Sequence, residues 1–279
     1  MGAHKPVDLH MHSTASDGQL TPEALVDRVV AAGVELMALT DHDTLEGVSA
    51  AQAHAAASGI RCLSGIELSA RWARGVVHIV GLNFDAQQPD LVTGVAQQLA
   101  ARRQRAQRIG ERLERAGCEG VLARVLDAAG ANGAPGRAHF ARDLVANGVV
   151  TDFRSAFSKY LKRGRPGYCA VEWATMEEVV AWIHAAGGKA VFAHPLRYGL
   201  SSGALRAVIQ RFVDCGGDAI EVVSGGSHRN DIESAAALAR RFNLVASVGS
   251  DFHDPAFQWS DVGRLGTLPK DLAPVWVHL

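Results

Sequence analysis

Hydrophobic and polar residues alternate along residues 7–13 of the chain. A period of two is typical of a strand, whose successive side chains point to opposite faces. His10 and His12 are therefore expected on one face, with Asp17 in the loop that follows. A His-x-His pair is a short pattern that also occurs on ordinary polar strand faces. The pair alone therefore leaves a metal site and a plain strand face equally open.

Strand and helix signals alternate through the next part of the chain. A helix is predicted from the cap Thr21-Pro22-Glu23 to Gly33, because a hydroxyl cap, an N-terminal proline and a closing glycine mark its ends. This rhythm predicts a parallel sheet with helices outside it. The further predicted strands are 34–39, 61–66, 76–82, 190–193, 219–223 and 244–248, and the further helices are 45–58, 175–186, 205–215 and 232–242.

The rhythm stops between residues 87 and 167, where we find no strand pattern. Val95, Ile109 and Leu113 share one face of a long helix, and arginines occupy its other faces. Shorter helices are predicted at 121–129, 140–147 and around 153–161, with a Gly/Pro-rich break at 130–136. We therefore expect a barrel domain made of 1–86 and 168–279, with a helical insertion at 87–167 that forms a substrate lid.

Composition places few further limits on function. The chain has 279 residues, 48% of them hydrophobic and 20% charged, which is typical of a globular protein. A net charge of −1 gives no general attraction to nucleic acid or membrane. Four widely spaced cysteines form no Cys-x-x-Cys pair. We find no signal region and no membrane-length apolar run, so we expect a cytoplasmic protein.

Potential metal ligands follow most of the predicted strands. In barrels of parallel strands, functional residues gather at the carboxyl ends of the strands. Each residue alone could be an ordinary core or loop residue, but their recurrence favours a shared metal centre. Imidazole and carboxylate without thiolate suit Mn²⁺, Zn²⁺ or Fe²⁺, and nine ligands suffice for two or three ions. The candidates are His10, His12, Asp17, His42, Glu67, His78, His194, Asp251 and His253.

Five motifs in this set resemble those of the polymerase and histidinol phosphatase (PHP) family. They are Asp8-Leu9-His10-Met11-His12-Ser13, Thr40-Asp41-His42-Asp43, Gly65-Ile66-Glu67, His194-Pro195 and Gly249-Ser250-Asp251-Phe252-His253. The resemblance implies a distorted (β/α)7 barrel with a trinuclear site that holds Mn²⁺, with Zn²⁺, Fe²⁺ and Mg²⁺ as alternatives. It implies three ligand groups: His10, His12, Glu67 and Asp251; Glu67, His78 and His194; and Asp17, His42 and His253.

Within this family the chain looks most similar to bacterial 3',5'-nucleotide bisphosphate phosphatases, also described as 5'-to-3' exoribonucleases. The resemblance implies hydrolysis of the 3'-phosphate to leave a 5'-nucleotide, and shortening of short RNA. Duplex DNA and membranes are not expected partners, and the oligomeric state stays open. The alternatives are a phosphatase for another small ester, such as histidinol phosphate, and a non-catalytic, metal-stabilised RNA-binding module.

The expected chemistry is direct hydrolysis by a metal-activated water, because bound metals lower the pKa of water to roughly 7. Glu67 and His194 would act at this centre, and Asp43 and His228 are candidate proton donors. For His228 an exposed loop residue is an equally open interpretation. Arginine suits phosphate because its planar fork donates two hydrogen bonds. The candidate substrate-binding residues are Arg102, Arg103, Gln104, Arg105, Arg137 and His139.

Overall fold

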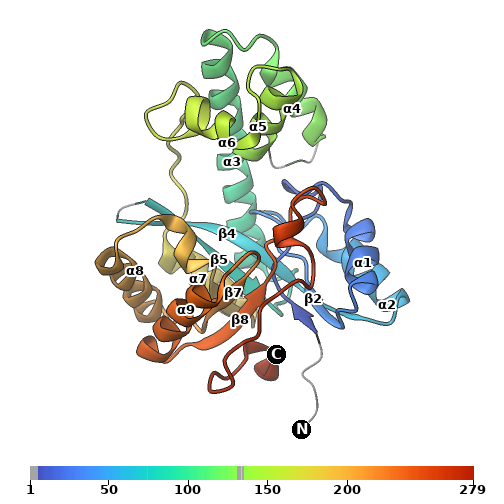
Figure 1. The fold of residues 1–279 in the computed structure, drawn as a ribbon, viewed down its shortest axis with the longest axis vertical. Coiled ribbons are helices and arrows are strands. Elements are labelled where there is room, and N and C mark those ends of the chain that lie inside the picture. Colours follow the sequence, from blue (N-terminus) through green and yellow to red (C-terminus); the bar gives the residue numbers. More distant parts are fainter. Residues whose placement is uncertain (1–5, 74, 131–132, 134) are drawn as a thin grey trace.

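The computed structural model describes residues 6–73, 75–130, 133 and 135–279 (Figure 1). The predicted break at 130–136 therefore lies partly outside the described residues. The described chain forms a mixed α/β body that carries a helical projection at one end, while the C-terminus lies toward the other end (Figure 1).

The strands form two sheets. Strands β1, β2 and β3 pair in parallel, and β4 to β8 pair in sequence order in a second sheet. The backbone N–H of Leu9 donates to Val248 at 3.1 Å, so β1 lies beside β8 where the two sheets meet. The strands are β1 (Val7–Asp8), β2 (Leu36–Ala38), β3 (Arg61–Leu63), β4 (Gly65–Trp72), β5 (Gly75–Leu82), β6 (Lys189–Phe192), β7 (Ala219–Ser224) and β8 (Val245–Gly249).

The expectation of one parallel sheet is wrong around β4 and β5. The predicted strand 61–66 is two strands, and the second runs on to Trp72 before the chain turns back at Gly75. β5 is therefore antiparallel to β4 and also to β6, while β6, β7 and β8 are parallel. Antiparallel strands need only a short turn between them, and no helix separates β4 from β5 to indicate a crossover.

The predicted helices are present, with ends shifted by a few residues. Thr21 caps α1 through its hydroxyl at 3.2 Å from the Ala24 N–H, and Thr175 and Glu178 form a capping box at the start of α7. The helices are α1 (Pro22–Ala31), α2 (Val48–Ala57), α3 (Pro89–Arg115), α4 (Val121–Ala129), α5 (Arg137–Ala146), α6 (Phe153–Ala156), α7 (Met176–Ala185), α8 (Ser202–Asp214) and α9 (Arg229–Phe242). Short helical turns are η1 (Phe157–Leu161), η2 (Pro195–Tyr198), η3 (Gln258–Ser260) and η4 (Val275–His278).

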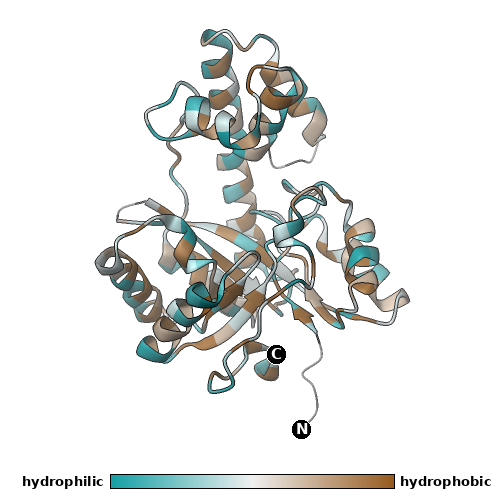
Figure 2. Ribbon diagram, viewed as in Figure 1, coloured by the Kyte–Doolittle hydropathy of each residue, from teal (hydrophilic) through white to brown (hydrophobic). Residues whose placement is uncertain are grey.

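Apolar side chains from both sheets share an inner core. Leu9 and Leu63 from the first sheet pack with Val80, Val191 and Ala219 from the second. A larger core lies between the second sheet and α7, α8 and α9, and a third joins α1 and α2 to the first sheet. The strands are accordingly mostly hydrophobic (Figure 2). This packing holds the ends of strands from both sheets next to one another.

The predicted helical insertion has a hydrophobic core of its own. Ile109 and Leu113 from α3 pack against Val121 from α4 and Phe140 from α5. The N-terminal half of α3 instead packs against α7, so the same helix joins the projection to the α/β body. Among the described residues, no helix is both long and apolar enough to cross a membrane.

Candidate metal centre

The nine candidate ligands lie together, although their positions in the sequence span more than 240 residues. Their imidazole rings are close neighbours, with ring centroids 4.1 Å apart for His12 and His253 and 4.9 Å apart for His42 and His78. The carboxylate of Glu67 is fully buried among them. The brought-together residues are His10, His12, Asp17, His42, Glu67, His78, His194, Asp251 and His253.

The strand arrangement explains how His78 reaches this place. Most of the other candidates lie at or beyond the carboxyl end of a parallel strand, as His194 lies beyond β6. His78 lies in the first half of β5, but β5 runs in the opposite direction, so its first half meets the same edge. Glu67 sits inside β4 and not at the end of a strand, and its backbone pairs with that of His42.

The candidate atoms form three overlapping groups of donors that could each hold a metal ion. In the first group, Nε2 of His12 lies 3.4 Å from Oε2 of Glu67 and 3.2 Å from Oδ1 of Asp251. Within each group the donor atoms all lie within 4.8 Å of one another. The groups are His10, His12, Glu67 and Asp251; His42, Glu67 and His78; and His12, Asp17, His42 and His253.

These groups differ in three ways from those implied by the family resemblance. His42 joins the second group as well as the third, and His12 joins both the first and the third. His194 is not part of any of the three groups, but its Nε2 lies 2.9 Å from Oε1 of Glu67. Glu67 therefore contacts five imidazoles and is the shared residue of the cluster.

The donor atoms suit metal ions because several are buried without a well-directed hydrogen bond among the described residues. Burial and the nearby His253 lower the pKa of His12 to about 3, so its imidazole is neutral, which is the form that binds metals. Although burial opposes it, the surrounding imidazoles hold the pKa of Glu67 well below its usual range. The unpartnered atoms include Nε2 of His10, both ring nitrogens of His12, Oδ1 of Asp17 and Oε2 of Glu67.

Two carboxylates outside the candidate set hold the cluster in place. Oε2 of Glu221 lies 2.8 Å from Nδ1 of His10 and accepts the backbone N–H of His194 at 3.2 Å. Asp41 accepts hydrogen bonds from the backbone N–H and the hydroxyl of Ser13. The contact with Glu221 fixes the orientation of the His10 imidazole, whereas Asp41 holds the loop between His12 and Asp17 through Ser13 and Ser16. Glu221 was not among the predicted site residues, because its contact with His10 joins residues 211 positions apart.

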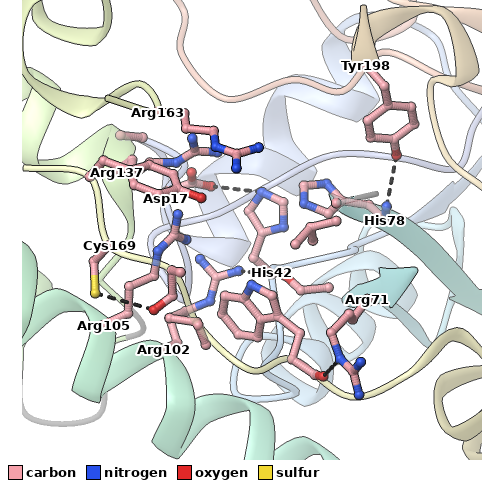
Figure 3. Close-up of a pocket in the computed structure, with 18 of the residues that line it drawn as sticks. Asp17, His42, Arg71, His78, Arg102, Arg105, Arg137, Arg163, Cys169 and Tyr198 are labelled. Carbon is pink, nitrogen blue, oxygen red and sulfur yellow. Dashed lines mark hydrogen bonds and ion pairs between the residues drawn. The ribbon is translucent and has the colours of Figure 1, made fainter. Parts of the chain in front are cut away.

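A cavity of about 700 Å³ opens beside the cluster. His42 and His78 lie on one side, arginines from the helical projection lie on the other, and Asp17 lies between His42 and Arg137 (Figure 3). The arginines are Arg102 and Arg105 from α3, Arg137 from α5, and Arg163. Arg163 is an exposed residue that also lines this cavity, and it was not among the candidate substrate-binding residues.

Arg102, which lines this cavity, forms a buried ion pair with Asp43. Nε and Nη2 of Arg102 lie 3.0 and 2.5 Å from Oδ2 of Asp43, and the Ser69 N–H donates to Oδ1 at 2.7 Å. Although burial opposes it, Arg102 holds the pKa of Asp43 below its usual range. An ionised carboxylate has no proton to donate. Asp43 is therefore better suited to hold Arg102 in position than to act as a proton donor.

Arg105 lies in an unusual environment for a cation. Its side chain is largely buried, its guanidinium lies over the Trp173 ring at 5.8 Å, and its Nε has no partner among the described residues. Burial, with Arg137 and Arg102 nearby, lowers the pKa of Arg105 to about 9. Like charges gathered in a partly closed cavity create a place where a bound anion is favoured.

The structure does not bring all the predicted substrate residues into this cavity. Arg103 and Gln104 are exposed on α3, and Arg103 lines a separate hollow beside Gly133. His139 lies in the first turn of α5 and accepts the Gly136 N–H through Nδ1 at 3.1 Å. His228 is an exposed residue at the start of α9 and does not line the cavity beside the cluster. Arg102 and Arg105 are three positions apart and so lie on one face of α3, whereas Arg103 and Gln104 point away from that face.

Two arginines at the site were not singled out from the sequence. Nη1 of Arg197 contacts Oδ2 of Asp251, and Nη2 donates to the Gly225 carbonyl at 2.6 Å. Nη2 of Arg142 donates to the backbone carbonyl of Asp17 at 2.7 Å and so ties α5 to the ligand loop. The contacts with Asp251 and Asp17 join residues more than 50 positions apart, so no local sequence pattern predicts them.

Comparisons with known proteins agree with the site and the fold. A family model described as the PHP domain matches residues 8–186. The chain is 43% identical to a 3',5'-nucleoside bisphosphate phosphatase from Chromobacterium violaceum, over 98% of this chain and 96% of that protein. It is 45% identical to the 5'-3' exoribonuclease Rnm of Escherichia coli, over 96% of this chain and 92% of that protein.

A solved structure with a similar fold is described as an amidohydrolase from Chromobacterium violaceum with bound sulfate and no metal. It superimposes with a TM-score of 0.93 at 43% identity, covering 98% of this chain and 95% of that chain. The likeness extends over both sheets and the helical projection, because nearly the whole of each chain is matched.

Proposed function

The chain belongs to the PHP domain family, and from this premise we propose that it is a metal-dependent phosphoesterase. Its proposed reaction is hydrolysis of the 3'-phosphate of nucleoside 3',5'-bisphosphates to give 5'-nucleotides. The same site would shorten short RNA from its 5' end. One observation carries the proposal: members of the cluster of metal-type ligands and four arginines from residues 87–167 line the same cavity.

The metal centre would hold two or three ions, with Mn²⁺ first and Zn²⁺, Fe²⁺ or Mg²⁺ as alternatives. Imidazoles and carboxylates without thiolates are a donor set that suits these ions. Bound divalent ions supply a more acidic water and stabilise the charge that develops on phosphoryl oxygens. Glu67 would be shared between ions, because its two oxygens reach donors of separate groups.

The arginines would hold the second phosphate of the substrate. Arg105 and Arg137 are largely buried, and burial lowers the pKa of both guanidinium groups. A bound phosphate would stabilise these buried positive charges through charge-assisted hydrogen bonds. Arg102 would keep its place through Asp43, so we assign Asp43 a positioning role. The exposed position of His228 offers no support for its role as a proton donor.

We also propose that the chain is divided into a barrel domain and a lid. The inner core shared by both sheets supports the interpretation of residues 1–86 and 168–279 as a distorted (β/α)7 barrel. The separate core of α3 to η1 supports the interpretation of residues 87–167 as a distinct lid. Because the lid carries Arg102, Arg105 and Arg137, its position over the cavity would determine which phosphate esters are accepted.

The proposal is tested by phosphate release from the Mn²⁺-loaded protein. Adenosine 3',5'-bisphosphate, histidinol phosphate and 5'-AMP are compared at equal concentration. We expect release from the bisphosphate, with 5'-AMP left intact, because 5'-AMP lacks the 3'-phosphate. A preference for histidinol phosphate would contradict the nucleotide proposal, since it has no second phosphate for the arginines. A chelated sample serves as the control and should release no phosphate from any of the three.

A further inference from the structure

A second cavity, of about 250 Å³, lies against another side of the metal-ligand cluster. It is bounded by η2, the turn after β7, the first turn of α9, and η3. His194 and Glu221 form its inner wall, and Arg197 and Trp259 form its outer part. None of these four residues lines the first cavity, the one of about 700 Å³ that contains the arginines. The cluster therefore has separate openings on two sides.

The outer wall of this second cavity presents an aromatic ring and a cation. Trp259 is 58% exposed, which is unusual for so large an apolar side chain. Phe257 stacks with it at a ring-centroid distance of 6.0 Å, and the Arg197 guanidinium lies 6.0 Å from its ring. Gly226 has φ +74° and backs the indole so closely that an added Cβ would lie 2.8 Å from Cε3. The indole is therefore supported from within and exposed to solvent.

The inner wall of the cavity presents a buried acceptor without a partner. Oε2 of Glu221 is used by His10 and His194, but Oε1 has no hydrogen-bond partner among the described residues. Glu221 is only 2% exposed, so water does not readily satisfy this oxygen. A hydroxyl group of a bound ligand is the kind of donor that would satisfy it.

We infer that this second cavity binds the second nucleotide of an RNA substrate, the nucleotide that carries the scissile phosphate on its 5' oxygen. The inference rests on the proposed function. Water would add to phosphorus, the bond from phosphorus to the 3' oxygen of the first nucleotide would break, and that oxygen would take a proton. The first nucleotide would leave as a 5'-nucleotide, and the phosphate would stay on the second.

The chemistry of the cavity matches a nucleotide in three respects. An exposed indole offers a stacking face for a base, and such stacking tolerates any base. The unpartnered Glu221 oxygen suits a ribose hydroxyl, which distinguishes RNA from DNA. The cavity is slightly smaller than most small-ligand sites, which start at about 300 Å³, so it has room for no more than one nucleoside unit, with the base on the exposed indole. A nucleoside bisphosphate has no second nucleotide and would not use this cavity.

The test compares two substrates of Mn²⁺-loaded protein: adenosine 3',5'-bisphosphate and the 5'-phosphorylated dinucleotide pApA. For Trp259→Ala we expect kcat/KM for pApA to fall about tenfold, the scale of one base–aromatic stack, with the bisphosphate reaction unchanged. Trp259→Phe should recover most of the loss, because it keeps a stacking face. Val277→Ala, which is 60% exposed and lies near the C terminus, is the matched control and should leave both reactions unchanged.

The outcomes separate this inference from the proposed function. If wild-type protein hydrolyses neither substrate, the proposed function fails. If wild-type protein hydrolyses both and Trp259→Ala slows both equally, Trp259 has a structural role and the inference is overturned. If Trp259→Ala changes neither reaction, the inference is also overturned. A deoxyribose in the second position should weaken pApA turnover in wild-type protein, which tests the hydroxyl contact without altering Glu221.

Discussion

The carboxylate of Glu221 lies 2.8 Å from Nδ1 of His10, and Nε2 of the same ring lies 3.4 Å from Glu67. One nitrogen of the ring is therefore held by a carboxylate while the other faces the centre of the cluster. A carboxylate in this position selects the tautomer and makes the free nitrogen a better ligand. Glu221 thereby couples β7 to the metal centre without entering any of the three ligand groups.

The first prediction concerns metal affinity. Glu221→Ala should weaken Mn²⁺ binding about 10- to 100-fold, the usual cost of losing such an outer partner. Glu221→Gln should cost less, because its side-chain oxygen can still accept the Nδ1 proton. Calorimetric titration of the chelator-treated protein measures both. Glu233→Ala, an exposed change on α9, is the control. An unchanged dissociation constant for Glu221→Ala would show that His10 needs no partner.

The second prediction concerns the buried pair of Asp43 and Arg102. Asp43→Asn keeps the shape of the side chain but leaves the Arg102 guanidinium buried without its counter-charge. Breaking a buried pair in this way costs about 3–5 kcal/mol of unfolding free energy, measured by urea unfolding at pH 7. Asp271→Asn removes the partner of Arg240 on the exposed surface and should leave the unfolding midpoint nearly unchanged.

The same pair predicts a pH dependence. The pKa of Asp43 is below its ordinary value of 3.8 in the folded chain, so its ionised form stabilises the fold above that pH. This contribution is lost as the pH falls through the folded pKa. The difference in unfolding free energy between wild type and Asp43→Asn should therefore be constant near neutral pH and shrink below pH 3.8. A difference that grew on acidification would contradict the sign of the shift.

The sequence was sufficient to predict most of the elements and the gathering of the nine candidate ligands. Local signals such as the Thr21 cap and the period of two at His10 and His12 predict the structure well, because they depend only on residues that are close in the chain. The antiparallel direction of β5 was not predicted, since no intervening helix or turn motif marked it. That direction is what brings His78 to the ligand edge of the sheet.

The site beyond the ligands was harder to predict because it depends on long-range contacts. Arg102 and Arg105 could have been separated from Arg103 and Gln104 by their spacing of three along α3, which places them on one face. No such rule could have found Glu221, whose partner His10 is 211 residues away. The shared face of Arg102 and Arg105 was thus visible in the sequence and was missed. The contact between Glu221 and His10 could be found only from the fold.

The third prediction concerns the residue at the middle of the cluster. Glu67→Ala should abolish turnover and reduce the number of ions bound per chain, because Glu67 belongs to two of the three ligand groups. Elemental analysis of the purified variant measures the ion count independently of activity. Glu233→Ala should retain the wild-type count. Substantial activity with fewer ions would mean that the ions do not share this carboxylate.

The fourth prediction concerns how the second phosphate is recognised. Arg137 lies on α5 and lines the cavity, with its guanidinium over the Phe157 ring at 5.6 Å. Arg137→Ala should raise KM for adenosine 3',5'-bisphosphate with little change in kcat, because a contact remote from the reacting phosphorus is equal in ground and transition states. A charged hydrogen bond is worth about 1.5–3 kcal/mol, so the rise should be about 10- to 100-fold.

A substrate with only one phosphate separates recognition of the second phosphate from general damage to the site. Adenosine 3'-monophosphate keeps the scissile group but lacks the 5'-phosphate, so Arg137→Ala should leave its kcat/KM almost unchanged. The variant would then lose most of the preference for the bisphosphate that wild-type protein shows. Arg108→Ala, an exposed arginine on α3, should preserve that preference. An equal loss on both substrates would assign Arg137 to the structure of the lid and leave the 5'-phosphate to Arg102 and Arg105.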